Sequence, residues 1–351
     1  MSLVRTRNED NVEKTNKFRR GSARLLTGVA LLMAAATPLP TLAAESGAAA
    51  SQLSAVRKGI PHDALFAMNI QGKNGLAVGG AGTLLETKDG GSTWNPVDSG
   101  TKVGLFGIGI AGEHRMVCGQ LGTVLKEEGG KWTALKTGFE QRLLNIDVNT
   151  AGLTIAVGEF GTVLRSKDGG KTWDKRELPW AEYRDDGYEP HMYAVDVQEN
   201  GRIVLGAEFS YVLVSDDGGE TFKLTNKGEK SIFAMHLLPD GSGYAAGQEG
   251  MVLKTSNNGD SWEPLKSGSE ANLFGIWASP QGEVVATGMR ALLRSSDAGA
   301  TFTVSTDTEV VRNWFVPVAM GETEMKGDGG AMVQQVVYIA GYNGTISRVL
   351  R

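Results

Sequence analysis

Ser166-Lys167-Asp168-Gly169-Gly170-Lys171-Thr172-Trp173 is one of five variants of a single eight-residue motif in this chain of 351 residues. The other copies occupy residues 87–94, 215–222, 255–262 and 295–302, so the motif returns about every 40 residues along much of the chain. Self-similarity at such a period is the signature of a repeat architecture, in which each repeat is one packing unit. The motif therefore decides the fold, and it also accounts for many polar residues that would otherwise suggest chemistry.

The motif has the composition of a turn between two strands. The carboxylate at its third position can accept hydrogen bonds from nearby backbone N–H groups, and glycine permits the positive φ that such turns use. The aromatic residue at its end can bury its ring. We interpret the aspartates as structural, because they lie on separate repeats and cannot converge on one metal or one substrate bond. They are Asp89, Asp168, Asp217 and Asp297.

Each repeat contains four short apolar runs separated by turns, which is the pattern of an antiparallel meander. The first run opens with Leu-Phe or a similar pair, the second ends in glycine, and a Gly-x-x-Gly turn leads to the third. Seven such glycines predict an all-β fold, a seven-bladed β-propeller of four-stranded antiparallel blades. They are Gly79, Gly119, Gly158, Gly206, Gly247, Gly288 and Gly341.

The two ends of the chain are predicted to share one blade. The seventh repeat stops at its third run, residues 345–349, whereas other repeats continue with a fourth run that reads Trp-x-x-apolar-x-x-Gly. Residues 53–59, Leu-Ser-Ala-Val-Arg-Lys-Gly, have the same spacing. We expect an N-terminal strand over residues 53–57 to complete the last blade, because pairing the first strand with the last removes open sheet edges.

Residues 1–44 have the composition of an export signal. Basic residues between positions 17 and 24 precede an apolar run over residues 25–36, and small residues lead to a cleavage site near Ala43 or Ala44. The apolar run is too short to span a bilayer comfortably, so we expect cleavage rather than a retained anchor, and no membrane span afterwards. The chain then divides into a signal peptide, 1–44, and a propeller, 45–351, which is exported to the periplasm or to the periphery of the inner membrane.

Charge and cysteine content exclude several classes of function. The chain has a net charge of −5, and cleavage after residue 44 removes seven basic and three acidic residues, which leaves −9. An acidic surface disfavours nucleic acid as a partner. Cys118 is the one cysteine, and it occupies the place of Val78 and Val157 in neighbouring repeats, so we interpret it as a buried apolar residue. The four histidines show no ligand spacing, so we expect no metal and no cofactor.

The motif is the Asp-box, also called the bacterial neuraminidase repeat. Together with the Gly-x-x-Gly-Thr-apolar-apolar run that precedes it, it resembles the exported photosystem II assembly and stability factor family, which has relatives in non-photosynthetic bacteria. The resemblance covers roughly residues 50–351. It implies a non-catalytic protein that binds protein subunits while a membrane complex is assembled. Residues 126–132 depart from the box by one missing residue, and blade seven has no box.

Two features outside the repeat are candidate protein-binding elements on one rim of the propeller. Each Gly-x-x-Gly turn presents two variable residues, which suit recognition of a partner but are also the polar residues that any turn needs. An insertion at residues 177–191 carries Trp, Tyr and Arg, which either contact a partner or pack on their own blade. The candidates are Gln120, Glu159, Phe160, Glu208, Phe209, Gln248, Glu249, Arg290 and Tyr342 in the turns, and Trp180, Tyr183, Arg184 and Tyr188 in the insertion.

Two further segments are interpreted without a functional role. Residues 320–335 of blade seven have the composition of a long, solvated loop on the opposite rim. His236 occupies the position that Asn69, Asp147 and Asp196 hold in other repeats. Side chains at this position either line the central channel or are hydrogen-bonded within the core.

We therefore expect a monomeric, non-catalytic scaffold whose partner is a membrane-protein subunit or a transporter component. A sialidase-like glycoside hydrolase is an alternative that shares the Asp-box, but it needs an arginine cluster and a tyrosine nucleophile with an acid partner, and the turns contain only Arg290. A carbohydrate-binding propeller is a second alternative, and it would repeat one residue pair in every turn. The pairs here differ from blade to blade.

Overall fold

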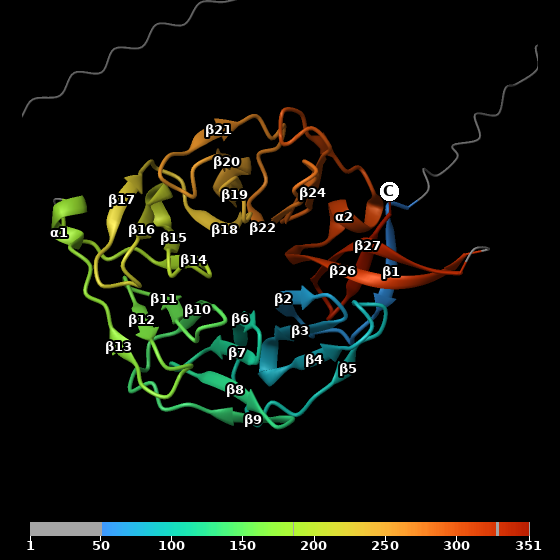
Figure 1. The fold of residues 1–351 in the computed structure, drawn as a ribbon. Helices are drawn as coiled ribbons and strands as arrows, with labels where there is room; N and C mark the ends of the chain where they lie inside the picture. Colours follow the sequence, from blue (N-terminus) through green and yellow to red (C-terminus); the bar gives the residue numbers. More distant parts are fainter. Residues whose placement is uncertain (1–50, 185, 328–329, 351) are drawn as a thin grey trace, which may run out of the picture. The chain divides into compact units, whose positions relative to one another are not determined.

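A computed structural model describes residues 51–184, 186–327 and 330–350, and the predicted signal peptide lies outside these ranges. Seven four-stranded antiparallel sheets follow one another around a central axis, so the predicted seven-bladed propeller is confirmed (Figure 1). In each sheet the first strand lies nearest the axis and the fourth lies at the outer edge. Residues on different blades therefore meet only at blade interfaces, at the two rims and along the axis.

The first four blades are continuous in sequence. Blade one contains β2 (Leu65–Gln71), β3 (Asn74–Gly79), β4 (Leu84–Thr87) and β5 (Asn95–Pro96). Blade two contains β6 (Leu105–Ala111), β7 (His114–Gly119), β8 (Val124–Glu128) and β9 (Lys131–Ala134). Blade three contains β10 (Leu143–Val148), β11 (Thr154–Gly158), β12 (Val163–Ser166) and β13 (Asp174–Lys175). Blade four contains β14 (Met192–Val197), β15 (Ile203–Ala207), β16 (Val212–Ser215) and β17 (Lys223–Asn226).

The remaining blades complete the circle. Blade five contains β18 (Ile232–Leu237), β19 (Gly243–Gly247), β20 (Val252–Thr255) and β21 (Glu263–Leu265). Blade six contains β22 (Leu273–Ala278), β23 (Val284–Gly288), β24 (Ala291–Ser295) and β25 (Thr303–Val304). Blade seven contains β26 (Phe315–Gly327), β27 (Gly330–Gly341), β28 (Ile346–Val349) and β1 (Leu53–Arg57). The short helices are η1 (Gly80–Gly82), α1 (Trp180–Tyr183), η2 (Glu208–Ser210), η3 (Gln248–Gly250) and α2 (Thr308–Arg312).

The core lies between blades, because the second strand of a blade is covered on both faces by its neighbours. Every residue of β11, β15, β19 and β23 is buried. Continuous apolar runs of this kind are typical of strands that are packed on both faces. Cys118 lies in one of these interfaces with no exposed surface, and burial raises the pKa of its thiol, as its apolar position in the repeat predicted.

The Asp-box forms the predicted turn between the third and fourth strands. In blade three, one carboxylate oxygen of Asp168 accepts the backbone N–H of Thr172 at 2.9 Å, and the other accepts the Thr172 hydroxyl at 2.6 Å. These bonds lower the pKa of Asp168 to about 2. The Trp173 indole N–H donates to the carbonyl of Gly170 at 3.0 Å. The polar groups of the box are thus used within the turn itself, and none is directed to a shared site.

The N-terminal strand closes the ring, as predicted. β1 pairs antiparallel with β28, with Leu53 opposite Val349 and Arg57 opposite Ile346. Figure 1 shows β1, in blue, beside the red strands of blade seven. We call this junction of β1 and β28 the seam. A hydrogen bond outside the strand also stabilises it, because the Gln52 N–H donates to the carboxylate of Asp307 at 2.6 Å. The first and last parts of the described chain therefore share one sheet.

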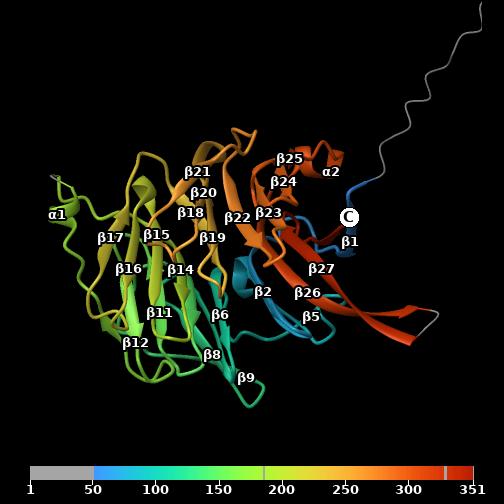
Figure 2. The same ribbon diagram turned by 45° about the horizontal axis from the view of Figure 1, so that its top comes forward.

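The prediction of a solvated loop over residues 320–335 was wrong. β26 and β27 continue through this segment as a paired hairpin, with Met320 opposite Val337 and Gly327 opposite Gly330. The hairpin extends away from the body of the propeller (Figure 2). The Asp-Gly sequence at residues 328–329 is typical of two-residue hairpin turns, and this signal outweighs the charged composition of the flanking residues.

Blade four corrects one detail of the repeat. Met192 opens its first strand and pairs with Ala207, just as Leu65 in blade one pairs with Gly79, so Ala207 rather than Gly206 holds the anchor position. The shortened box of blade two forms a two-residue hairpin instead, with Glu128 opposite Lys131. The two glycines between them both have positive φ, which matches the right-handed twist of the strands.

Candidate functional site

One rim of the propeller is built by the same hydrogen bond in every blade. The backbone N–H of the first variable residue in each Gly-x-x-Gly turn donates to the carbonyl just before the first strand of that blade. Gln120 donates in this way to Gly104 at 3.0 Å, and Glu159 to Arg142 at 3.1 Å. The turns and the loops that enter each blade are therefore tied together on one side, which we call the turn rim. The 177–191 insertion belongs to it, since it connects β13 to β14.

The second variable residue of each turn has a left-handed backbone. Non-glycine residues adopt positive φ at a cost of about 1 kcal/mol each, and bulky residues are uncommon there. Here the same conformation recurs in all seven blades, with φ between 49° and 59°. Strained conformations that the surrounding structure enforces are often found at binding surfaces. The residues are Ala81, Leu121, Phe160, Phe209, Glu249, Arg290 and Asn343.

The turn rim collects exposed apolar side chains. Leu121 is 71 % exposed and Phe160 is 58 % exposed, both from the left-handed position. Four further large apolar residues that are exposed lie in turns or entry loops of the same rim. They are Ile60, Tyr188, Met289 and Val311. A soluble protein gathers apolar residues on one face chiefly where a partner covers them.

Several predicted site residues stabilise the rim itself. The side-chain oxygens of Gln120, Glu208 and Gln248 accept the N–H groups of Gly104, His191 and Ser231, at 2.9, 3.0 and 3.3 Å. These are equivalent positions, each one residue before the first strand of its blade. The first variable position therefore has a structural role in three blades, and its side chains are only partly available to a ligand.

The other turn candidates make ion pairs or hydrogen bonds across the rim. Glu159 pairs with Arg142 at 3.0 Å, and Glu249 pairs with Lys230 at 3.2 Å. The Tyr342 hydroxyl donates to the carboxylate of Glu309 in α2. The Arg290 N–H donates to the carbonyl of Asn313 at 2.9 Å, and its side chain is exposed.

The insertion separates into a buried half and an exposed half. Trp180 is only 6 % exposed and packs in the interface of blades three and four, where Tyr183 meets it edge-on with ring centroids 5.9 Å apart. The Tyr183 hydroxyl donates to the carbonyl of Phe222 at 3.3 Å. Trp180 and Tyr183 therefore pack on their own blades, which was one of the two alternatives for the insertion. Trp180 has little exposed surface left for a partner.

Arg184, Tyr188, Phe209 and Glu208 form a compact group on the turn rim. The Arg184 guanidinium lies 4.1 Å from the centroid of the Phe209 ring, while it also pairs with Asp186. The Tyr188 hydroxyl donates to Glu208 at 3.0 Å, and its ring meets Phe209 edge-on. Tyr188 remains 41 % exposed. Four predicted candidates are thus brought together, whereas Gln120, Gln248, Arg290 and Tyr342 lie on other blades.

A channel along the axis begins just below the turn rim. It encloses a cavity of ≈ 920 Å³ lined by the first strands of all blades. The second residue of each first strand places one apolar side chain at its mouth, and we call this set the collar. The collar residues are Phe66, Phe106, Leu144, Tyr193, Phe233, Phe274 and Val316.

The collar rings contact one another around the mouth. Ring centroids are 5.3 Å apart for Phe66 and Phe106, 5.2 Å for Tyr193 and Phe233, and 5.4 Å for Phe233 and Phe274. All seven collar residues keep some exposed surface. The Leu-Phe pair that opens three of the seven first strands was the available sequence signal for the collar. A strand whose side chains alternate between the core and the channel cannot be recognised from one repeat alone.

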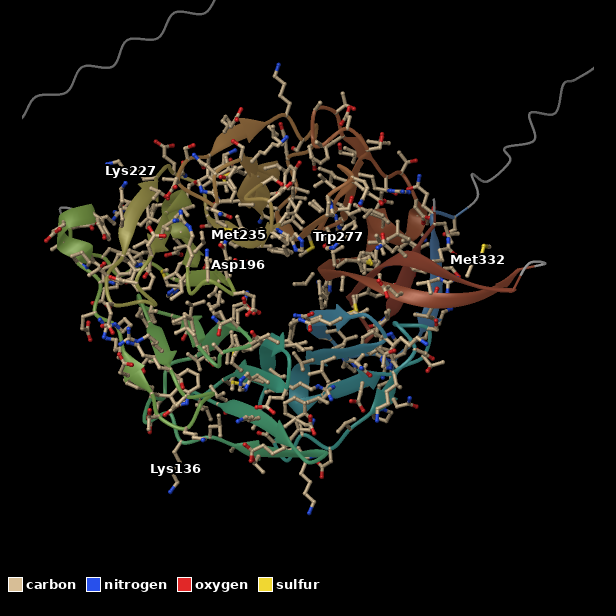
Figure 3. The ribbon with its side chains drawn as sticks, in the orientation of Figure 1. Lys136, Asp196, Lys227, Met235, Trp277 and Met332 are labelled. Atoms are coloured by element: carbon tan, nitrogen blue, oxygen red, sulfur yellow. The ribbon has the colours of Figure 1, made fainter. Side chains whose placement is uncertain are left out.

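The chemistry of the channel changes with depth. A second layer of apolar residues lies two positions further along each strand, and the next position is polar in four of the seven blades. Asn69, Asp147 and His236 line the cavity there, and Asp196 holds the same position in blade four. Figure 3 shows Asp196, Met235 and Trp277 around the central opening, with Lys136 and Lys227 at the outer edge. The side chains at this position were expected either to line the channel or to be hydrogen-bonded in the core. In the structure, the channel is lined by Asn69, Asp147 and His236.

Comparison with known proteins agrees with this architecture. The profile of the family described as photosynthesis system II assembly factor YCF48 matches residues 126–230. The predicted resemblance is confirmed. One segment of the chain is similar to this family, and it spans the end of blade two and all of blades three and four, including the insertion. No protein of curated function matches the chain.

Solved structures of similar fold include two of YCF48 itself. YCF48 bound to a D1 peptide has 20 % identity and a TM-score of 0.64, over 86 % of this chain and 96 % of that one. YCF48 from Cyanidioschyzon merolae has 17 % identity and a TM-score of 0.62, over 85 % and 98 %. The WD40 propeller of Doa1 has 13 % identity and a TM-score of 0.61, over 85 % and 96 %. At these identities the likeness establishes the propeller fold.

The pKa values of the two acidic groups in the channel are raised. Burial and the charge of Asp196 raise the pKa of Asp147, and burial raises the pKa of Asp196. The Val197 N–H donates to Asp147 at 2.7 Å, which places Asp147 against the strand that carries Asp196. Burial lowers the pKa of His236 to about 4, so its imidazole is neutral. Among the described residues, no three His, Cys, Asp or Glu side chains are grouped to hold a metal, and no helix is long and apolar enough to cross a membrane.

Replacement of Asp147 by asparagine is expected to stabilise the propeller at high pH. A carboxyl group whose pKa is raised by folding contributes stability below its unfolded value near 4, and that stability is lost as the pH rises towards its folded value. The asparagine amide would stay neutral, and its oxygen could still accept the Val197 N–H. We expect a gain of about 1–2 kcal/mol at pH 8.5 and little change at pH 5. Urea denaturation at both pH values, with Glu263→Gln on an outer strand as control, measures the difference, and a loss of stability at pH 8.5 would contradict the expectation.

Proposed function

We propose that this chain is a non-catalytic, exported scaffold that binds a protein subunit or transporter component while a membrane complex is assembled. One observation carries the proposal: exposed apolar side chains of several blades, Leu121 and Phe160 among them, gather on the turn rim. Isolated apolar residues on a surface need no explanation, but a set on one face of a rigid scaffold is typical of a protein-binding surface.

The comparison with YCF48 supports the same conclusion. YCF48 is an assembly factor, and one of its structures holds a D1 peptide on a propeller of this fold. Likeness of fold alone does not transfer a partner, since propellers serve many functions. What it adds here is that a propeller of this kind has room for a peptide, and the turn rim with the channel below it is the surface that would receive one.

Site-specific photo-crosslinking tests the proposal. A photoreactive residue at Phe160 or Leu121 on the turn rim is expected to capture one specific membrane protein in cells of the native host. The same residue at Lys88 or Lys171, two exposed lysines in Asp-box turns on the rim opposite the turn rim, is the matched control and is expected to capture none. Equal adducts at the turn rim and in the Asp-box turns, or no specific adduct at the turn rim, would contradict the proposal. Turnover of a fluorogenic sialoside by the purified protein would instead favour the sialidase alternative.

A further inference from the structure

The collar is too large and too accessible to be explained by packing alone. Seven blades each direct an apolar residue into one opening, and five of the seven are aromatic. The cavity behind them, ≈ 920 Å³, has the size and the mainly apolar lining of a ligand site rather than of a packing defect. Contact between a wide apolar surface and water is unfavourable, and binding of an apolar segment would remove that surface from water.

The deeper layer adds a charge that the channel itself does not balance. Asp147 lines the cavity, and Asp196 lies beside it in the next blade. Among the described residues that line the cavity there is no Lys or Arg. Among the described residues of the lining, His236 is the one histidine, and burial lowers its pKa to about 4, so its imidazole is neutral. A carboxylate held out of water without a cation raises the energy of the site, and a cation from outside lowers it.

The two layers are separated by a distance that one basic side chain can cover. The acidic layer lies three residues further along each strand than the collar, which corresponds to about 10 Å. A Lys or Arg side chain that enters through the collar passes its methylene groups along apolar walls and carries its charge inward. Its cation also meets the faces of the collar rings, which attract positive charge. An Asp or Glu side chain would instead be repelled by the faces of the collar rings and by the carboxylates of the deeper layer.

We infer that the central channel binds a Lys or Arg side chain that projects from an apolar segment of the partner protein. The apolar residues of that segment pack in the collar, and the cation reaches Asp147 and Asp196. This inference rests on the proposed function, and it adds the chemistry of the segment that is recognised. The net negative charge of the chain also favours the approach of a basic partner.

A pair of labelled peptides tests the inference with the full chain at pH 8. One peptide has two apolar residues on each side of a central lysine, and the other has glutamate in its place. Fluorescence anisotropy is expected to show that the lysine peptide binds about tenfold more tightly or better, as for a hydrogen bond between charged groups. In the double variant Asp147→Asn and Asp196→Asn the two affinities should become nearly equal. Phe233→Ala in the collar should weaken both peptides alike.

The control and the contrary outcomes are defined in the same assay. Glu263→Gln removes an exposed carboxylate on an outer strand and should leave the preference for lysine unchanged. Equal affinities for the unmodified protein, no binding of either peptide, or a preference that survives in the double variant would each overturn the inference. A partner that crosslinks at Phe160 while the peptides show no preference would leave the proposed function standing. If the protein preferred the lysine peptide but no partner were captured in cells, the inference about the channel would stand and the proposed function would fail.

Discussion

A chain that begins at residue 60 is expected to unfold at a temperature about 10 °C lower than a chain that begins at residue 51. The shorter chain lacks β1, so the buried side chain of Leu53 is lost and the edge of β28 is left unpaired. It also loses the hydrogen bonds that tie Gln52 to Asp307 and to the N–H of Leu350. Because β1 joins the two ends of the circle, its loss should also allow blade seven to separate from blade one.

Loss of β1 is also expected to make the protein associate into oligomers. The open edge of β28 would present free N–H and C=O groups, which favour pairing with another chain. Size-exclusion chromatography with light scattering should therefore show oligomers for the chain from residue 60 and a monomer for the chain from residue 51. A synthetic peptide of residues 51–59 should restore much of the lost stability. Equal melting temperatures for the two chains would contradict the role of the seam.

The sequence could predict the seam and the number of blades because both depend on spacing. The Asp-box marks one turn per blade, and the run from Leu53 to Gly59 matches the fourth strand that blade seven lacks. Repeats expose such regularities directly, since each repeat uses the same local chemistry. The predicted turn of Asp168 follows from short-range hydrogen bonds alone, and those are within reach of a single segment of sequence.

The site was harder to predict because its residues meet only in three dimensions. Trp180 had the composition of an exposed hot spot, yet it packs where Gly161 has no side chain: a Cβ at Gly161 would lie 2.4 Å from its indole nitrogen. The collar assembles from seven repeats that are far apart in sequence, and its residues alone look like ordinary strand residues. The charge of Asp196 affects the pKa of Asp147 only because the neighbouring strands β10 and β14 bring the two side chains together.

Replacement of Gly250 by alanine is expected to destabilise the protein by about 3 kcal/mol or more. Gly250 is the last glycine of the blade-five turn, with φ of +69°, and its N–H donates to the carbonyl of Ala271 at 2.7 Å. A Cβ at this position would lie 1.7 Å from the carbonyl oxygen of Ser269. That neighbour is backbone, so the turn and the entry loop must separate, and the turn rim of blade five loses its geometry.

A second glycine separates the two causes of this loss. Gly129, in the hairpin of blade two, also has positive φ, +59°, but a Cβ there would meet nothing within 4 Å. Gly129→Ala should therefore lose only the conformational cost, about 1 kcal/mol. Urea denaturation of both variants measures the difference, which we attribute to the contact with Ser269. If Gly250→Ala were no worse than Gly129→Ala, the entry loops would be able to move away from the turns, and the turn rim could not be the rigid surface on which the proposed binding depends.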